Sequence, residues 1–219
     1  MSLHQEMSVK PGFFTMPLHP SGRNYLETLK EDREAIIMAE RLGYIEAYVG
    51  VHTTDLVETI PSCPMFLSTR VHATSRIKLG TGTLNPPNGH QAACAANVAM
   101  LDNLDEGCFI VGIGPGGLRC DMDAFENLDR DRKAMLHDCI ILMIAIWTGE
   151  APYGLKGRFW NISTQRTLIT EIGQASVLKT FQCPHPPMVI TAVEPFSAGG
   201  AAAAARGWEP ISANFLLPQ

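Results

Sequence analysis

The sequence lacks a strong excess of either charge, since 17 lysines and arginines stand against 22 aspartates and glutamates, for a net charge of −5. This mild acidity argues against a binding surface for nucleic acid or for an anionic membrane. No apolar run reaches the ~20 residues that a membrane span needs. The first residues also lack a charged segment followed by an apolar one, so we expect no signal peptide and a cytoplasmic location.

Cysteine pairs and ligand clusters are missing as well. The six cysteines form no Cys-x-x-Cys pair and lie in apolar runs or predicted helices, where we expect small buried side chains in a reducing compartment. We find no metal-ligand spacing, no Gly-x-Ser-x-Gly and no convincing pair of carboxylates. With 46% apolar and 18% charged residues, the 219-residue chain is typical of a globular protein with one large core.

A strand–helix–strand pattern lies at the centre of the chain. Residues 77–84 and 108–114 are apolar runs of strand length, and apolar residues recur between them at helical spacing. A helical crossover between two such strands makes them parallel. Turn residues follow both strands, at 85–90 and at 115–117. Because ligands bind at the carboxyl ends of parallel strands in α/β folds, we expect the functional site there.

Strands and helices alternate along the rest of the chain. The remaining strands are predicted at residues 12–19, 45–50, 188–193 and 211–217, and the remaining helices at 25–42, 65–74, 130–148 and 197–206. Residues 1–11 are predicted to be a disordered lead-in, and the acidic segment after Gly117 is predicted to be a loop. Residues 157–162 and 177–181 are candidate hairpin strands.

The strands are too apolar to have a face exposed to water, which predicts a parallel sheet covered by helices. A closed (β/α)8 barrel usually takes about 250 residues, whereas this chain holds about six strand–helix repeats and its last strand lacks a helix. The predicted fold is therefore α/β, an incomplete barrel of the (β/α)8 TIM type that forms a single domain over residues 12–219. An open barrel exposes strand edges, which can pair with another chain, so we expect a homo-oligomer.

Seven blocks of sequence, in order along the chain, resemble the bacterial luciferase-like monooxygenase family. They lie at residues 14–19, 39–52, 76–82, 90–102, 107–116, 157–160 and 186–197. That family consists of (β/α)8-barrel enzymes that use reduced flavin or a deazaflavin, and this chain is most similar to its limonene-type members. The chain departs from the family pattern at Val51, where a carboxylate is common, at Gln91 and at Cys108, and the final strands and helices are absent.

The resemblance implies an enzyme, a flavin-dependent monooxygenase that uses reduced FMN and O2 on a small apolar organic substrate. It also implies a separate flavin reductase that supplies the reduced FMN. Two alternatives stay open. One is a deazaflavin-dependent oxidoreductase on the same scaffold, which transfers hydride without oxygen. The other is a flavin-binding protein or enzyme fragment without turnover, which Val51 and the missing final quarter of the barrel favour.

His52 follows the second predicted strand, where the resemblance places a catalytic histidine. An imidazole at this position can orient a reacting group or act as a general base near neutral pH. The alternative is a structural histidine of the loop. His19 and His90 also follow strands, and for both a structural role and a ligand contact are open.

Candidate cofactor-binding residues follow the other strands. Asn85 could hydrogen-bond the edge of a flavin ring or simply make a turn. Gly114 and Gly116 could let a flat ring approach the backbone, an interpretation favoured over a dinucleotide fingerprint because Pro115 interrupts the turn and no clear helix follows. The resemblance implies that the helix start at Ser197 seats the flavin phosphate, although it could be a plain N-cap. The full set is Met16, Asn85, Gly114, Gly116, Val193, Ser197 and Ala198.

Overall fold

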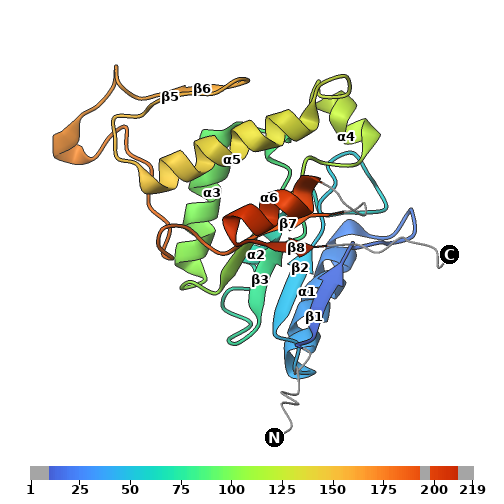
Figure 1. The fold of residues 1–219 in the computed structure, drawn as a ribbon. Helices are drawn as coiled ribbons and strands as arrows, with labels where there is room; N and C mark the ends of the chain where they lie inside the picture. The colour runs from blue at the N-terminus through green and yellow to red at the C-terminus, as the bar shows by residue number, and fades with distance from the viewer. Residues whose placement is uncertain (1–9, 193–197, 212–219) are drawn as a thin grey trace, which may run out of the picture.

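Six parallel strands form one sheet in the computed structural model, which describes residues 10–192 and 198–211 (Figure 1). The strands are β1 (Gly12–Thr15), β2 (Glu46–Val49), β3 (Lys78–Thr81), β4 (Phe109–Ile113), β7 (Met188–Thr191) and β8 (Glu209–Ile211). They lie in the order β1-β2-β3-β4-β7-β8, and every neighbouring pair is parallel. Among the described strands β8 does not pair with β1. The sheet is therefore an open, incomplete barrel, which confirms the predicted fold.

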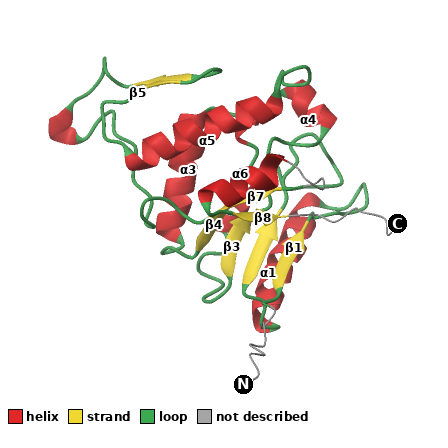
Figure 2. Cartoon of the chain, in the orientation of Figure 1, coloured by secondary structure: helices red, strands yellow, loops and turns green. Residues whose placement is uncertain are grey.

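Helices connect successive strands and return the chain to the same end of the sheet, so that the strands run parallel (Figure 2). The helices are α1 (Tyr25–Arg41), α2 (Cys63–Ser68), α3 (Gln91–Leu104), α4 (Arg119–Ala124), α5 (Arg132–Thr148) and α6 (Ala198–Arg206). Short 3-10 turns lie at Pro86–Asn88 and Thr170–Ile172. A small antiparallel hairpin of β5 (Gly154–Lys156) and β6 (Asn161–Ser163) projects from the rest of the molecule beyond α5 (Figure 1).

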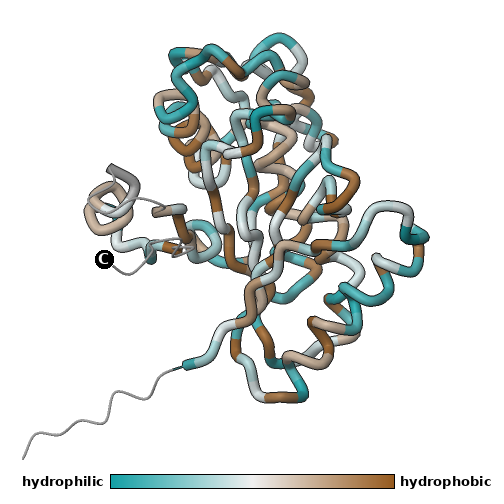
Figure 3. The backbone as a smooth tube through the Cα atoms, turned by 90° about the vertical axis from the view of Figure 1, so that its right-hand side faces the viewer, coloured by the Kyte–Doolittle hydropathy of each residue, from teal (hydrophilic) through white to brown (hydrophobic). Residues whose placement is uncertain are grey.

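The two faces of the sheet are packed differently, because successive side chains of a strand point to opposite faces. Val49 and Val111, on the face that the helices cover, are fully buried in the main core. On the opposite face, Tyr48, Ile110 and Val189 form a second, smaller cluster. Apolar segments accordingly lie in the interior, and hydrophilic ones gather at turns on the periphery (Figure 3).

Local sequence signals fix the ends of the two longest helices. The Asn24 side chain accepts a hydrogen bond from the backbone N–H of Glu27 at 3.2 Å and so caps α1. Gly43, which follows α1, has φ +88°, a left-handed conformation that suits glycine and confirms the predicted stop. Asp131 caps α5 in the same way, accepting from the N–H of Ala134 at 3.0 Å.

Two of the predicted elements were wrong in extent or type. The helix predicted at 65–74 ends at Ser68, where the backbone N–H groups of Thr69 and Arg70 bond to the carbonyls of Phe66 and Leu67, three residues back, and tighten the last turn. The acidic segment predicted as a loop contains α4. The carboxylate of Asp121 in α4 binds backbone N–H groups elsewhere in the chain, a contact that local sequence does not reveal.

The predicted hairpin was also wrong, since β5 pairs with β6 and residues 177–181 form no strand. A buried carboxylate explains the turn. Asp138 of α5 accepts hydrogen bonds from the N–H groups of Arg158 at 2.9 Å and Phe159 at 2.8 Å. A Cβ on Gly157 would lie 2.6 Å from the same carboxylate, so the turn needs glycine there.

Several other expectations can be compared with the described residues. No helix there is long and apolar enough to cross a membrane. All six cysteines are free, but Cys120 and Cys183 are exposed, so the expected burial was wrong for these two. Residues 1–9 of the predicted lead-in and 212–217 of the predicted last strand lie outside the described part of the chain.

Candidate functional site

A cavity of about 180 Å³ lies where five of the parallel strands end. Residues that follow β1, β2, β3 and β4, together with Thr191 at the end of β7, line it, and His52 lies in this wall. The structure thus brings together five of the predicted site residues, which come from distant parts of the sequence. They are Met16, His52, Asn85, Gly114 and Gly116. Of the other three, Val193 and Ser197 lie outside the described residues, and Ala198 is the first residue of α6.

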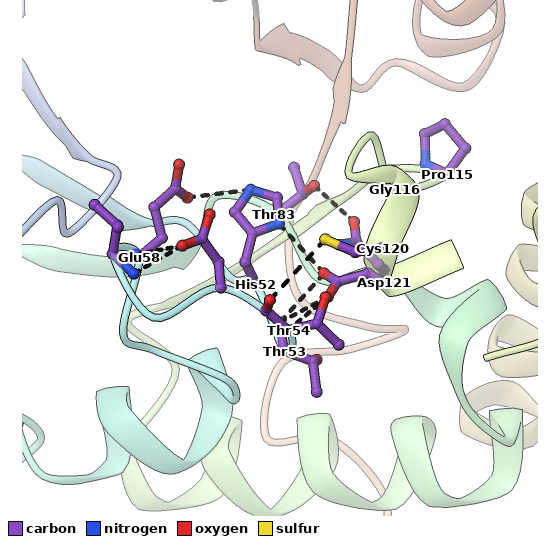
Figure 4. A network of polar contacts seen from close by, with 12 residues as sticks. His52, Thr53, Thr54, Glu58, Thr83, Pro115, Gly116, Cys120 and Asp121 are labelled. Atoms are coloured by element: carbon purple, nitrogen blue, oxygen red, sulfur yellow. Dashed lines mark hydrogen bonds and ion pairs between the residues drawn. The ribbon is translucent and has the colours of Figure 1, made fainter. Parts of the chain in front are cut away.

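His52 lies between two carboxylates, one at each ring nitrogen (Figure 4). Nδ1 is 3.3 Å from Oδ2 of Asp121, and Nε2 is 3.1 Å from Oε2 of Glu58. Val51 does not supply the carboxylate that is common at its position in the family, but two carboxylates from other parts of the chain flank the histidine. Sequence reasoning missed both acids, because Asp121 is 69 residues from His52 in the chain and Glu58 lies in an irregular loop. No local signal marks either of them.

Asp121 is anchored by hydrogen bonds to the loop that follows His52. It accepts from the backbone N–H of Thr53 at 3.1 Å, and from the N–H and hydroxyl of Thr54 at 2.8 and 2.6 Å. Burial alone would raise the pKa of Asp121, but these bonds and the contact with His52 outweigh it, so the pKa is lowered. The carboxylate therefore stays ionised at neutral pH and holds both the loop and the Nδ1 side of the imidazole.

The surroundings of Glu58 shift its pKa in the opposite direction from that of Asp121. Burial raises its pKa, the nearby His52 opposes that effect, and the negative charges of Asp55 and Asp121 raise the pKa further. The net direction is upward. Its Oε2 accepts no hydrogen bond of good geometry, although it lies within ion-pair distance of Nε2. Glu58 is thus more readily protonated than Asp121, and its Oε2 lies 3.1 Å from Nε2 of His52.

The glycines of the loop that follows β4 are needed for different structural reasons. A Cβ on Gly114 would lie 2.7 Å from Oγ1 of Thr83 and 3.1 Å from Oγ1 of Thr191, so packing against these threonines requires glycine there. Gly116 has φ +79°, which the turn needs. A Cβ on Gly117 would meet nothing within 4 Å, so this part of the wall is open to a flat ligand.

The remaining candidates have identifiable contacts. Arg132 of α5 donates hydrogen bonds to the carbonyl oxygens of Pro115 and Gly116 and holds the loop in place. The Thr83 hydroxyl lies 3.3 Å from Oδ1 of Asn85, which orients the amide at the cavity. Nδ1 of His90 accepts from the N–H of Ala92 at 3.3 Å, so this histidine caps α3. Within the described residues no cluster of side chains could hold a metal ion.

Comparison with known proteins agrees with the family resemblance of the sequence. A family model described as luciferase-like monooxygenase matches residues 9–215. The 4-hydroxyprotoasukamycin monooxygenase of Streptomyces nodosus subsp. asukaensis is 32% identical over 141 residues, which cover 64% of this chain and 38% of that protein. Limonene 1,2-monooxygenase of Rhodococcus erythropolis is 34% identical over 124 residues, covering 56% of this chain and 32% of that one.

A solved structure shares the fold. It is the oxygenating constituent of 3,6-diketocamphane monooxygenase from Pseudomonas putida, a type II Baeyer-Villiger monooxygenase in complex with FMN. The TM-score is 0.85 at 21% identity, and the match covers 94% of this chain and 57% of that one. This chain therefore spans only about a third to a little over half of the length of the proteins that it matches.

Proposed function

Because this chain belongs to the luciferase-like monooxygenase family, we propose that it is a flavin-dependent monooxygenase that uses reduced FMN and O2 on a small organic substrate. The observation that carries the proposal is a histidine held between two carboxylates, in the wall of a cavity at the carboxyl ends of the strands. Parallel α/β barrels bind their ligands at this end.

The residues at the cavity fit a flavin. The open backbone at Gly117 leaves room for a flat ring, and the Asn85 amide offers hydrogen bonds to its edge. We assign ring contacts to Met16, Asn85, Gly114 and Gly116, and the phosphate to Val193, Ser197 and Ala198. When bound, reduced FMN would supply the electrons that activate O2.

The chain's own residues would hold and move a proton beside the ring. Asp121, whose pKa is lowered, keeps its charge and fixes the orientation of His52. Glu58, whose pKa is raised, can accept a proton from Nε2 or return it, so that His52 can serve as a general acid or base. The apolar side chains of Met16, Val51 and Pro115 in the same wall limit the access of water.

A His52→Asn substitution tests this role. It keeps the size and polarity of the side chain but removes the titratable ring, so O2-dependent product formation should fall about 10²- to 10⁴-fold. Binding of reduced FMN, measured by calorimetry under anaerobic conditions, should change by less than about twofold, because a catalytic proton contact adds little to ground-state binding. The matched control is His137→Asn, at an exposed histidine of α5.

The results for turnover and for cofactor binding distinguish the three candidate functions. Turnover that survives His52→Asn at the level of the control would contradict the assigned role. A chain that binds reduced deazaflavin but not reduced FMN would instead support the alternative of a hydride-transferring oxidoreductase. A chain that binds none of these cofactors would be a fragment without the proposed activity.

A separate flavin reductase is the partner that we propose, since the reaction consumes reduced FMN. We also propose that both proteins work in the cytoplasm. A reducing compartment fits six cysteines that form no disulfide. The proposed reductase can be tested by adding a purified NADH-dependent flavin reductase and following product formation, which should then depend on NADH.

A further inference from the structure

Residues 179–182, which we call the anchor segment, cross the C-terminal ends of α3 and α5, at the end of the sheet opposite the proposed flavin cavity. The Asn103 side chain of α3 donates to the carbonyl oxygen of Lys179 at 2.9 Å. The ammonium of Lys179 donates to the carbonyl oxygen of Ile146 in α5 at 3.2 Å. The anchor segment therefore ties two helices together before the chain enters β7, whose last residue, Thr191, lines the proposed flavin cavity.

Asp102 of α3 makes the strongest attachment of the anchor segment. It is fully buried, and both of its oxygens are used. Oδ2 accepts from the backbone N–H of Gln182 at 2.9 Å, and Oδ1 accepts from Nε2 of the same residue at 2.7 Å. That Nε2 also donates to the carbonyl oxygen of Phe109, the first residue of β4, at 2.9 Å. Asp102 thus fastens the anchor segment to α3 and to the start of β4.

Asp105, three residues further along, ends α3 as its C-cap. It is partly buried, and its Oδ2 is buried and has no hydrogen-bond partner among the described residues. Burial and the neighbouring Asp102 both oppose the charged form and raise the pKa of Asp105 to about 7. The partial negative charge at the end of a helix disfavours a carboxylate there as well. The position of Asp105 in the fold therefore favours a neutral carboxyl.

A cavity of about 260 Å³ adjoins Asp105. Its wall brings further titratable side chains towards the carboxyl, His72 from the loop before β3 and Glu106 and Cys108 from the turn into β4. Together with Asp102 these are the titratable groups that face Asp105. No lysine, arginine or histidine in the described part of the chain forms an ion pair with Asp105. A negative charge on Asp105 would therefore lack a compensating partner.

We propose that Asp105 is a proton-dependent switch that controls how firmly the anchor segment is held. While Asp105 is neutral, Asp102 binds Gln182 without opposition. When Asp105 loses its proton, two carboxylates one helical turn apart repel each other away from bulk water, and release of the anchor segment relieves the repulsion by admitting water. The attachment is therefore firm in mild acid and weakened above neutral pH. This inference does not depend on the proposed function.

Hydrogen exchange at the amide of Gln182 tests the switch. A carboxyl whose pKa is raised in the folded state lowers stability as the pH rises from its ordinary value of 3.8, and the loss is complete above about 7. The protection factor of this amide, which corrects for the intrinsic pH dependence of exchange, should fall at least about tenfold between pH 5 and pH 8. In Asp105→Asn it should change by less than about twofold, because no proton is lost there.

Two variants serve as controls. Glu106→Gln removes a carboxylate from the exposed neighbouring residue and should keep the full response. His72→Gln should keep it too, which would exclude the histidine of the cavity wall as its origin. Thermal unfolding checks that each variant is folded.

A carboxyl-carbon NMR titration of Asp105 gives a second, direct measurement, and its midpoint should lie at about pH 7. A midpoint at the ordinary value of 3.8 would overturn the inference. A pH response of the Gln182 amide that persists in Asp105→Asn, or one that disappears in His72→Gln, would overturn it as well.

Discussion

At the scale of single residues, the site depends on contacts between side chains that are distant in the sequence. The position of His52 at the cavity was predictable, because a residue shortly after a buried strand lies at the end of the sheet where ligands bind. Glu58 and Asp121 were not, since neither stands in a local motif and the fold alone brings them to the imidazole. The reason predicted for Gly114 was also incomplete, because neighbouring threonines already exclude a Cβ there.

Asp121→Asn should lower the free energy of unfolding at pH 7 by about 1–3 kcal/mol, because charge-assisted hydrogen bonds from residues 53 and 54 are lost. The pKa of Asp121 is lowered in the folded state, so its contribution is fully present above the ordinary value of 3.8 and disappears as the pH falls below it. Urea unfolding of both proteins from pH 7 down to pH 3 measures the difference. A difference that stays constant over this range would contradict the assigned contacts.

At the scale of elements, the alternation of strands and helices followed from hydrophobic patterning and from capping residues close to each helix. Asn24, which caps the start of α1, and Gly43, which follows its end, both lie within a few residues of the helix, so local sequence patterns include them. The β5–β6 hairpin was mispredicted because its turn is fixed by Asp138 from another element. Elements that depend on local signals were therefore predictable, and those that depend on tertiary contacts were not.

Gly43→Ala should lower the free energy of unfolding by about 1 kcal/mol, because φ at this position is +88° and an L side chain is strained there. The effect should be purely conformational, since a Cβ at Gly43 would meet nothing within 4 Å. Gly117→Ala is the matched control, as its Cβ also meets nothing within 4 Å and its φ lies outside the left-handed region. If the two variants unfold at the same denaturant concentration, the conformational explanation fails.

At the scale of the whole molecule, the six-stranded sheet leaves β1 with an unpaired edge among the described strands. Phe14 of β1 is 45% exposed, and β1 alternates between exposed and half-buried residues. Apolar strand edges tend to pair with other chains. We therefore propose that the chain forms a homo-oligomer through this edge.

Sedimentation velocity at micromolar concentration should show a dimer or a larger species, and Phe14→Lys should shift the distribution towards the monomer, because a lysine on an edge strand opposes pairing. Lys78→Ala, at an exposed position of the interior strand β3, is the control and should not change the distribution. A monomer at every concentration of the unmodified chain would refute the proposed assembly.

His52 lines two cavities, the one where the strands end and a second, of about 340 Å³, between the loops that follow β1 and β2, and this shared position has a thermodynamic consequence. A molecule that shifts the imidazole or its proton from one side alters the wall that the other side presents. Occupancy of the two chambers is then linked, and linkage is reciprocal: whatever factor the first ligand applies to the affinity of the second, the second applies to the first. The imidazole that both walls share would thus set the strength of this coupling for any pair of ligands.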